Sequence, residues 1–339
     1  MKQAHLAELL PGARVAVGQC LNVQPDDRVL VITDADTKII GEALATVARE
    51  TGAVVEVVQL EMFGERPFTE VPEGLRAALE AFRPTATFFA AQGQPGEVSF
   101  RIQLGHILRN EFTTRHGHMI GITPALMKTG MRADYQRVAA LTMRVYEHVR
   151  NARQIRVTNE DGTDFTVYLD PEERRWVPCT GLYHEQGQWG NLPEGEVFTA
   201  PVSAQGTLTA NLLGDYFSHK YGLLEQPMHF YVKEGEIVRL EHPQAALVDE
   251  VWAYLSSAEN GRRVGEFAIG TNEALTALTG NLLQDEKFPG VHVAFGNPYP
   301  DLTGADWTSA IHVDIIPLNV NVWVDGERLM ERGQFVIDR

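Results

Sequence analysis

The first half of the chain alternates apolar runs with amphipathic segments. Four runs have the length and the β-branched and aromatic content of buried strands, at 28–33, 54–60, 87–91 and 118–122. Helical periodicity fills the intervals and continues beyond them, over 39–49, 75–82, 102–110 and about 133–151. Continuous apolar strands separated by helices are typical of a parallel sheet covered on both faces. The pattern predicts an α/β domain over residues 1–151 with a doubly wound, mainly parallel sheet.

The second half has a different pattern. Strand-like runs come in pairs around Gly-containing turns, at 156–169, 228–240 and from 320 past Asp325-Gly326. Helical patterns interrupt these pairs near 245–257 and 273–283. Paired strands with occasional helices predict an α+β domain over residues 152–339 that is rich in antiparallel hairpins.

The predicted α/β domain lacks the usual nucleotide signatures. No G-x-G-x-x-G follows a strand, and the chain contains no G-x-x-x-x-G-K-[ST] motif. His116 and His118 would share one face of a strand, but no carboxylate or cysteine is close in sequence. We therefore expect structural or surface histidines there, and assign this domain no cofactor.

Charge is unevenly divided. The net charge is −16, and residues 1–150 hold 16 Lys/Arg and 17 Asp/Glu against 13 and 28 in residues 151–339. A nucleic-acid surface needs a basic stripe, so nucleic acid is not an expected partner. The first twenty residues form an amphipathic pattern rather than a signal peptide, and no stretch approaches the roughly 18 apolar residues of a membrane span. Two distant cysteines fit a reducing compartment, so we expect a cytoplasmic protein without a membrane partner.

The segment 309–316 holds the sharpest candidate chemistry. His312 and Asp314 are two residues apart within an apolar strand pattern, so their side chains point to one face. Buried ionisable groups need partners. A structural His–Asp hydrogen bond and a metal site both satisfy that need, and the pair alone does not separate them.

Three other segments place polar residues beside apolar strands. His292 lies in a strand that ends at a Gly-Asn-Pro turn, which could fold Tyr299 back towards it. Glu266 lies in an apolar segment bounded by glycines, and Glu196 begins a strand that follows an exposed turn at Glu194. The run 285–287 (Asp-Glu-Lys) sits at a predicted helix end, where solvated charges are the ordinary explanation.

Taken together, these residues indicate a metal centre. Two histidines and three carboxylates border apolar strands in the acidic half. Imidazole and oxygen ligands without thiolates suit Zn²⁺, Mn²⁺, Co²⁺, Mg²⁺ or Fe²⁺. Five or six ligands exceed the three of a single catalytic ion and match a pair of ions about 3.5–4 Å apart.

The ordered motifs from Leu192 to Phe335 resemble the aminopeptidase T/aminopeptidase S family of thermophilic-type metallo-aminopeptidases. They are E-V-F-T-A-P, G-E-x-x-x-G-T-N, D-E-K-x-x-G-x-H-x-A-x-G-x-x-Y, S-x-x-H-x-D and V-D-G-E. The resemblance implies a dinuclear exopeptidase with an N-terminal α/β domain, a metal-bearing C-terminal domain and a homodimeric assembly. It implies two divalent ions (Zn, Co, Mn or Mg) and a small peptide substrate with a free N-terminus. The implied ligands are Glu196, Glu266, His292, Tyr299, His312 and Asp314, with Glu286 as the general base and Tyr299 as a ligand or oxyanion donor.

Two departures keep alternatives open. The interval between Tyr299 and His312 looks shorter than in the family's peptidases, which bears on peptide specificity. A related branch resembles 2,5-dihydroxypyridine 5,6-dioxygenase, a mononuclear Fe(II) ring-cleaving enzyme in which a histidine stands at the position of Glu266. The alternatives are that dioxygenase chemistry on the same scaffold, and a metal-stabilised binding protein without catalysis.

Overall fold

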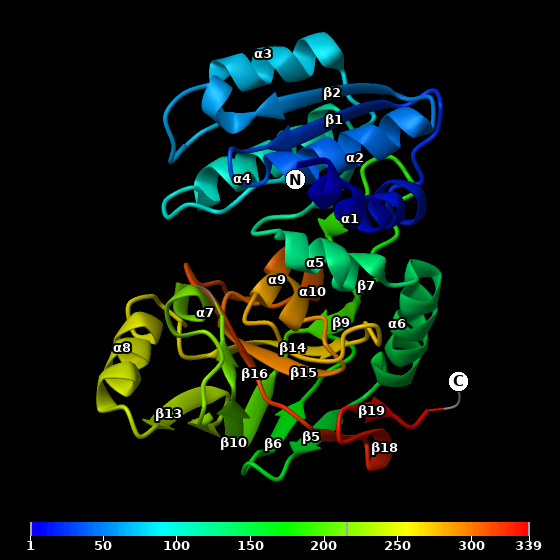
Figure 1. Ribbon diagram of the computed structural model, residues 1–339. Helices are drawn as coiled ribbons and strands as arrows, with labels where there is room; N and C mark the ends of the chain where they lie inside the picture. Colours follow the sequence, from blue (N-terminus) through cyan, green and yellow to red (C-terminus); the bar gives the residue numbers. More distant parts are fainter. Residues whose placement is uncertain (1, 215, 338–339) are drawn as a thin grey trace. The chain divides into compact units, whose positions relative to one another are not determined.

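The computed structural model describes residues 2–214 and 216–337 (Figure 1), and these divide into two compact units. Unit 1 comprises residues 1–139 and 181–194, and unit 2 comprises residues 140–180 and 195–339. Helix α6 (Tyr135–Val149) carries the chain from unit 1 into unit 2. The domain boundary expected after residue 151 lies just beyond the end of this helix. That residues 1–151 and 152–339 are separate domains stays a prediction.

Unit 1 contains a five-stranded sheet in the order β2-β1-β3-β4-β8, with every neighbouring pair parallel. Its strands are β1 (Arg28–Thr33), β2 (Val54–Gln59), β3 (Ala86–Ala90), β4 (Arg115–His118) and β8 (Trp189–Asn191). The fourth strand ends where the sequence pattern predicted it to begin, because residues 119–122 turn back: Ile122 donates its backbone N–H to Met119 O. Strand β8 was not predicted at all.

Helices cover both faces of this sheet (Figure 1). Leu30 and Ile32 pack with α3 and α4, whereas Val29 and Val31 point to the opposite face, where α2 contacts β1. The predicted α/β class is therefore confirmed. The helices of unit 1 are α1 (Lys2–Arg14), α2 (Lys38–Glu50), α3 (Glu73–Phe82), α4 (Val98–His106) and α5 (Pro124–Lys128), with short turns η1 (Val15–Cys20), η2 (Leu60–Met62), η3 (Ile107–Glu111) and η4 (Gly130–Arg132).

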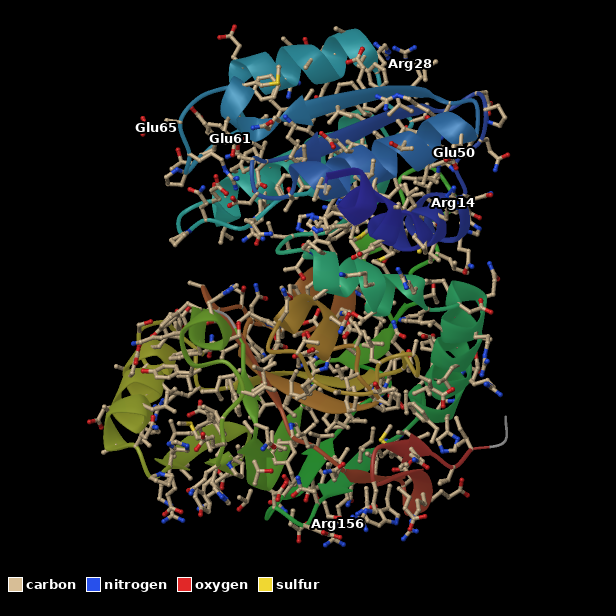
Figure 2. The ribbon with its side chains drawn as sticks, viewed as in Figure 1. Arg14, Arg28, Glu50, Glu61, Glu65 and Arg156 are labelled. Carbon is tan, nitrogen blue, oxygen red and sulfur yellow. The ribbon has the colours of Figure 1, made fainter. Side chains whose placement is uncertain are left out.

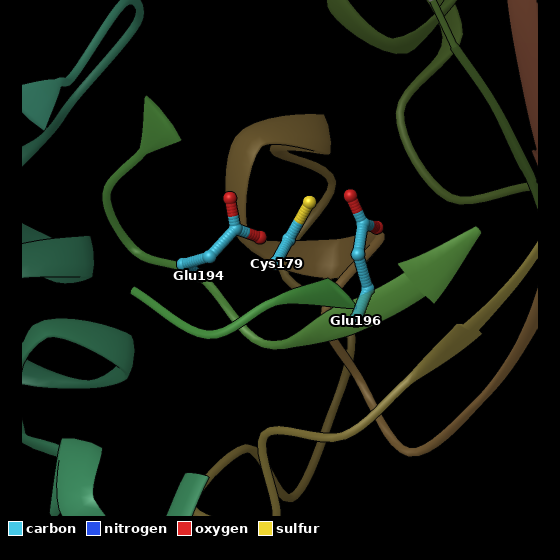
Figure 3. Close-up of side chains that lie close together, drawn as sticks. All are labelled: Cys179, Glu194 and Glu196. Atoms are coloured by element: carbon cyan, nitrogen blue, oxygen red, sulfur yellow. The ribbon is translucent and has the colours of Figure 1, made fainter. Parts of the chain in front are cut away.

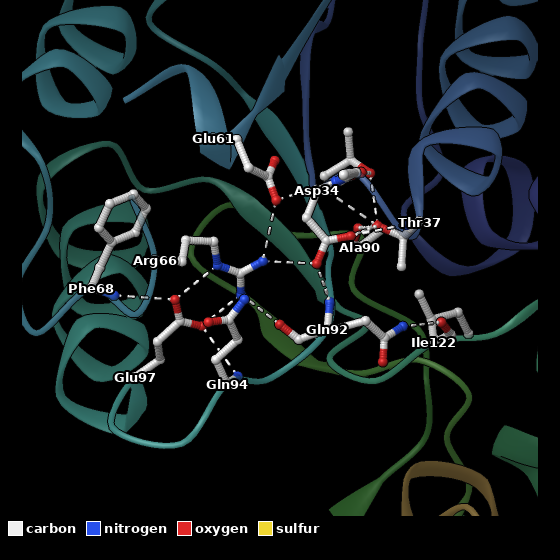
Figure 4. Close-up of polar contacts among 12 residues, drawn as sticks. Asp34, Thr37, Glu61, Arg66, Phe68, Ala90, Gln92, Gln94, Glu97 and Ile122 are labelled. Atoms are coloured by element: carbon white, nitrogen blue, oxygen red, sulfur yellow. Dashed lines mark hydrogen bonds and ion pairs between the residues drawn. The ribbon is translucent and has the colours of Figure 1, made fainter. Parts of the chain in front are cut away.

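Ion pairs tie these elements at the surface and in the interior. Arg14 of α1 lies 3.1 Å from Glu50 of α2 at the surface (Figure 2). In the interior, the Arg66 guanidinium donates to Asp34 after β1 (2.9 Å) and to Glu97 before α4 (2.6 Å), with both carboxylates buried (Figure 4). Arg66 also donates to Gln92 O, 2.6 Å away. Open parallel sheets usually bind ligands at the carboxyl ends of their strands, and here protein groups fill that position between β1 and β3.

Unit 2 is built from two antiparallel sheets, which confirms the predicted α+β class. One has the order β13-β12-β10-β6-β5-β17-β18-β19 and contains all three predicted hairpins. Its strands are β5 (Gln154–Thr158), β6 (Asp164–Tyr168), β10 (Ser203–Ala210), β12 (Met228–Lys233), β13 (Glu236–Glu241), β17 (Asn321–Val324), β18 (Glu327–Glu331) and β19 (Gln334–Phe335).

The other sheet has the order β11-β16-β15-β14-β9-β7. Its strands are β7 (Val177–Cys179), β9 (Glu196–Thr199), β11 (Leu212–Leu213), β14 (Val264–Gly270), β15 (Gly290–Gly296) and β16 (His312–Ile316). One apolar core joins the two sheets, and Phe267, Val293 and Ile315 enter it from this second sheet. Because side chains alternate along a strand, every other residue of β14, β15 and β16 points away from that core.

Unit 2 has few helices besides the end of α6. They are α7 (Tyr216–Tyr221), α8 (Ala245–Leu255), α9 (Leu282–Asp285) and α10 (Pro300–Thr303). The helix predicted over 273–283 is wrong: only the short α9 forms. The Asp285 carboxylate accepts the backbone N–H groups of Thr279 and Gly280, and Gly280 adopts a φ of +84°, so this segment forms turns around a buried carboxylate.

No helix within the described residues is long and apolar enough to span a membrane.

Candidate metal centre

Four neighbouring strands supply the predicted ligands. Glu196 begins β9, Glu266 lies in β14, His292 in β15, and His312 and Asp314 in β16. In the register of the sheet, Glu266 lies opposite Ala294, which in turn lies opposite Asp314. All five side chains lie on the face of the sheet that points away from the apolar core.

Small residues separate the ligands on this face. Ala268 pairs with His292, Ala294 lies between Glu266 and Asp314, and Gly270 pairs with Glu196. Larger side chains at Ala268 and Ala294 would fill the space between the carboxylates and the imidazoles, whereas a side chain at Gly270 would meet the backbone of 287–288. The alternation of small and ligating residues therefore leaves room for ions above the sheet.

Glu266 is the central residue of the cluster. Its Oε1 lies 3.2 Å from His292 Nε2, and its Oε2 lies 3.7 Å from His312 Nε2. Two sets of three ligand atoms, each lying within 4.8 Å of one another, share this residue: Glu196, Glu266 and His292 form one, and Glu266, His312 and Asp314 form the other. A carboxylate with one oxygen in each set has the geometry of a bridging ligand.

The donor set fits divalent cations. Glu196 Oε2 is buried without a hydrogen-bond partner among the described residues, 3.5 Å from His292 Nε2. His312 Nδ1 lies 2.8 Å from Asn297 O, which orients the ring so that Nε2 faces the carboxylates. Such outer hydrogen bonds commonly orient metal-binding histidines. The buried, unpaired carboxylate oxygen and the oriented imidazole together favour a bound cation.

The electrostatics of the cluster agree with this assignment. Burial alone would lower the pKa of His292, but its hydrogen bond to Glu266 and the nearby charges of Glu196 and Asp314 raise it to about 9. Burial is likewise outweighed at His312, where Asp314 and Glu266 raise the pKa to about 10. Each imidazole thus lies in a strongly negative field, the field that also attracts a metal ion.

The run 285–287 is not a solvated helix end as expected, because Asp285 and Lys287 are buried and Glu286 is only partly exposed. Glu286 follows α9, and burial, opposed by Lys287, raises its pKa to about 8. The ammonium group of Lys287 lies 2.8 Å from Glu286 Oε1 and 2.7 Å from Glu196 Oε1. Sequence reasoning passed over Lys287, although a lysine directly after the proposed base was a signal that could have singled it out.

The ring of Tyr299 packs next to the proposed ligands. The ring centroid is 4.8 Å from that of His312 and 6.0 Å from that of Phe198, and the residue is 39% exposed. The segment after it is anchored, because the Arg175 guanidinium donates to the carbonyl oxygens of Leu302 and Asp301. The Tyr299 ring packs against the His312 ring, and its role as a ligand or oxyanion donor stays a prediction.

Cys179 and Glu196 lie side by side on β7 and β9, as cross-strand partners (Figure 3). The thiol therefore lies at the edge of the proposed ligand set. Glu194, expected at an exposed turn, is buried instead, because its backbone N–H donates to the Tyr135 hydroxyl and Tyr183 lies 3.5 Å from its carboxylate.

Comparison with known proteins identifies the scaffold. Across nearly the whole of both chains, the fold is similar to that of two solved structures. AmpT from Thermus thermophilus matches with a TM-score of 0.70 and 20% identity, over 98% of this chain and 99% of that one. The 2,5-dihydroxypyridine dioxygenase from Pseudomonas putida KT2440 also matches with a TM-score of 0.70, at 16% identity, over 100% of this chain and 99% of that one. No curated protein sequence matches significantly.

The family model described as thermophilic metalloprotease (M29) matches residues 132–335. This range includes every proposed ligand, the proposed base and Lys287. The chain belongs to the thermophilic metalloprotease (M29) family.

Proposed function

We propose that the protein is a metal-dependent aminopeptidase that hydrolyses the first peptide bond of small peptides with a free N-terminus. The observation that carries the proposal is the two ligand sets that share Glu266. Two adjoining sets match a two-metal hydrolase, in which ions about 3.5–4 Å apart act on one water and one carbonyl. Membership of the metalloprotease family supports hydrolysis of peptides.

In this proposal each ligand has a defined place. Glu196 and His292 would hold one ion and His312 and Asp314 the other, with Glu266 contributing a carboxylate oxygen to each set. We expect Zn, Co, Mn or Mg. When bound, such ions lower the pKa of a coordinated water and polarise a substrate carbonyl.

Glu286 is the proposed general base. Its carboxylate lies near His292 and Asp314, within the ligand cluster and close to where a water held by the ions would lie. It would take the proton of the attacking water and return it to the leaving amine. Tyr299 is the proposed further contact, as a ligand or as a hydroxyl donor to the oxyanion.

The test is Glu286→Gln in the metal-loaded protein. The variant should bind the same number of ions, while hydrolysis of an aminoacyl-anilide falls about 10²–10⁴-fold. Glu327→Gln, at an exposed residue of the other sheet, is the matched control and should keep full activity. Turnover of Glu286→Gln within a few-fold of the wild type would reject the assignment of the base.

The alternative is a mononuclear Fe(II) ring-cleaving dioxygenase, and the fold similarity to 2,5-dihydroxypyridine dioxygenase is the observation that supports it. Metal stoichiometry separates the two. Two ions per chain with aminoacyl-anilide hydrolysis supports the peptidase, whereas one iron with substrate-dependent oxygen uptake supports the dioxygenase. Bound metal with neither activity would support a metal-stabilised binding protein.

A second variant tests the role of Glu266 directly. Glu266→His replaces a two-oxygen bridge by an imidazole, which binds one ion through one nitrogen. We expect it to lower the stoichiometry from two ions to one. A cytoplasmic location and a homodimeric assembly remain predictions, and sedimentation of the metal-loaded protein tests the dimer.

A further inference from the structure

A buried lysine, Lys287, contacts both a proposed metal ligand, Glu196, and the proposed general base, Glu286. Lys287 is 1% exposed, and its Nζ lies 2.7 Å from Glu196 Oε1 and 2.8 Å from Glu286 Oε1. Its backbone is fixed as well: Lys287 N–H donates to Gln284 O, and Asn272 N–H donates to Lys287 O at 3.0 Å. A buried ammonium needs carboxylate partners, and Glu196 and Glu286 supply two of them.

The contact with Glu196 leaves only one carboxylate oxygen for a metal. The ammonium takes Oε1, whereas Oε2 is buried without a hydrogen-bond partner among the described residues. Oε2 is the oxygen that faces His292, at 3.5 Å from Nε2. The lysine therefore favours coordination of Glu196 through one oxygen and disfavours chelation through both.

The contact with Glu286 fixes the other carboxylate. Glu286 is the residue directly before Lys287, and its side chain is 14% exposed. The ammonium of Lys287, 2.8 Å away, restrains Glu286 Oε1, so Oε2 is the oxygen left to accept a proton. General-base transfer depends on such positioning, and displacements of about 1 Å lower rates about 10²-fold.

We propose that Lys287 is a positioning residue for the metal centre: its ammonium keeps Glu196 a one-oxygen ligand and holds Glu286 in place for proton transfer. The statement about Glu196 depends on metal binding alone. The statement about Glu286 rests on the proposed function.

Lys287→Met in the full-length protein separates this role from simple packing. Methionine has a similar length but carries neither the charge nor the donors, so it frees Glu196 Oε1. Removing a positive charge beside the ions should tighten metal binding about threefold or more. Because Glu286 loses its restraint, kcat should fall about 30-fold or more with little change in KM. A purely structural lysine would instead weaken metal binding and activity together.

The Co(II)-substituted protein supplies a readout that is independent of activity. Chelation by both oxygens of Glu196 raises the coordination number, which weakens and shifts the visible d–d absorption of Co(II). We expect this change in Lys287→Met and not in Lys220→Met. Lys220 is a suitable control because it also pairs with a carboxylate, Glu250, at 2.6 Å, but lies at the surface of unit 2.

An unchanged Co(II) spectrum with unchanged or weaker metal binding in Lys287→Met would overturn the Glu196 half of the proposal, and unchanged kcat would overturn the Glu286 half. If the wild type shows no peptidase activity, the proposed function fails, but the spectrum and the metal affinity still test Lys287. If Lys287→Met does not fold, Lys287→Ala refolded with propylammonium replaces it, and recovery of the wild-type spectrum on adding the amine supports the proposal. Failure of both variants to fold would make the lysine structural and overturn it.

Discussion

Gly270 lies where the strand that carries Glu266 passes close to the segment that carries Glu286 and Lys287. A Cβ added at Gly270 would lie 2.1 Å from Phe288 O and 2.8 Å from the carbonyl carbon of Lys287. Contacts of Cβ atoms below 3.0 Å are essentially never found, and here the obstacle is backbone. Gly270→Ala must therefore push the 286–288 segment away from the sheet by about 1 Å.

The expected magnitude follows from this displacement. Glu286 and Lys287 would move relative to Glu196, whose contact with Lys287 is 2.7 Å. A misplacement of about 1 Å costs about 10²-fold in rate, which corresponds to about 2.7 kcal/mol in the activation barrier. The ligands of β15 and β16 are not touched, so the ion of the His312 set should still bind.

The assay is hydrolysis of an aminoacyl-anilide by the metal-loaded variant, with the ion content measured on the same sample. Gly18→Ala is the matched control, because a Cβ there meets no atom within 4 Å. The control should keep wild-type kcat and ion content. A kcat of Gly270→Ala within about twofold of the wild type, with the protein folded, would show that the 286–288 segment does not need its present position.

Three further predictions concern the rest of the molecule. Burial lowers the pKa of His116 from 6.5 to about 3, so the unfolded chain binds a proton that the folded chain does not, and stability falls as the pH falls between these values. Urea denaturation should show unit 1 about 2 kcal/mol less stable at pH 5 than at pH 7 from this residue, and His116→Gln should lack that component; equal pH dependence of both proteins would contradict it. Ala294→Leu should fill the space between Glu266 and Asp314 and weaken metal binding about tenfold or more by isothermal titration, whereas Val293→Ala, on the apolar face, should cost about 1–3 kcal/mol of stability and leave the metal affinity unchanged. Metal at about 100 times its Kd should protect β9, β14, β15 and β16 from hydrogen exchange by up to about 2.7 kcal/mol, and uniform protection that includes β1–β4 would locate binding elsewhere.

The parts of the fold that follow a regular period could be predicted from sequence. Apolar runs located β1, β2 and β3, and Gly-containing turns located the hairpins of unit 2. The helix predicted over 273–283 failed because a local side-chain hydrogen-bonding pattern replaced it: Asp285 accepts the backbone N–H groups of Thr279 and Gly280, five and six residues before it, that a helix would have used internally. Strand β8 was missed because three residues, 189–191, carry no periodicity, and they form a strand only because β4 offers a free edge.

In the candidate site, too, local spacing could be predicted from the sequence, whereas contacts between distant segments could not. The spacing of His312 and Asp314 predicted a shared face, and the register of β14, β15 and β16 brings Glu266 and His292 to it. The contact of Lys287 with Glu196 joins residues 91 positions apart, and no local pattern encodes it. The role of small residues could not be predicted from the sequence either. Ala294 has no ligating group, and its small size matters only because it lies between Glu266 and Asp314 in the folded sheet.

The charge of the cluster is itself an argument for its function. Glu196, Glu266, Glu286 and Asp314 are largely buried, and Lys287 offers one opposing charge. Buried carboxylates in such excess do not stabilise a fold, and apolar residues of similar volume would serve that purpose better. A structural hydrogen bond between His312 and Asp314 would account for one carboxylate only. The other carboxylates need Lys287 and either two protonated imidazoles, as the raised pKa values of His292 and His312 indicate, or bound cations in place of the imidazole protons. These four residues are a small part of the 28 acidic side chains in residues 151–339, and the rest of that excess therefore needs an explanation at the surface rather than in the site.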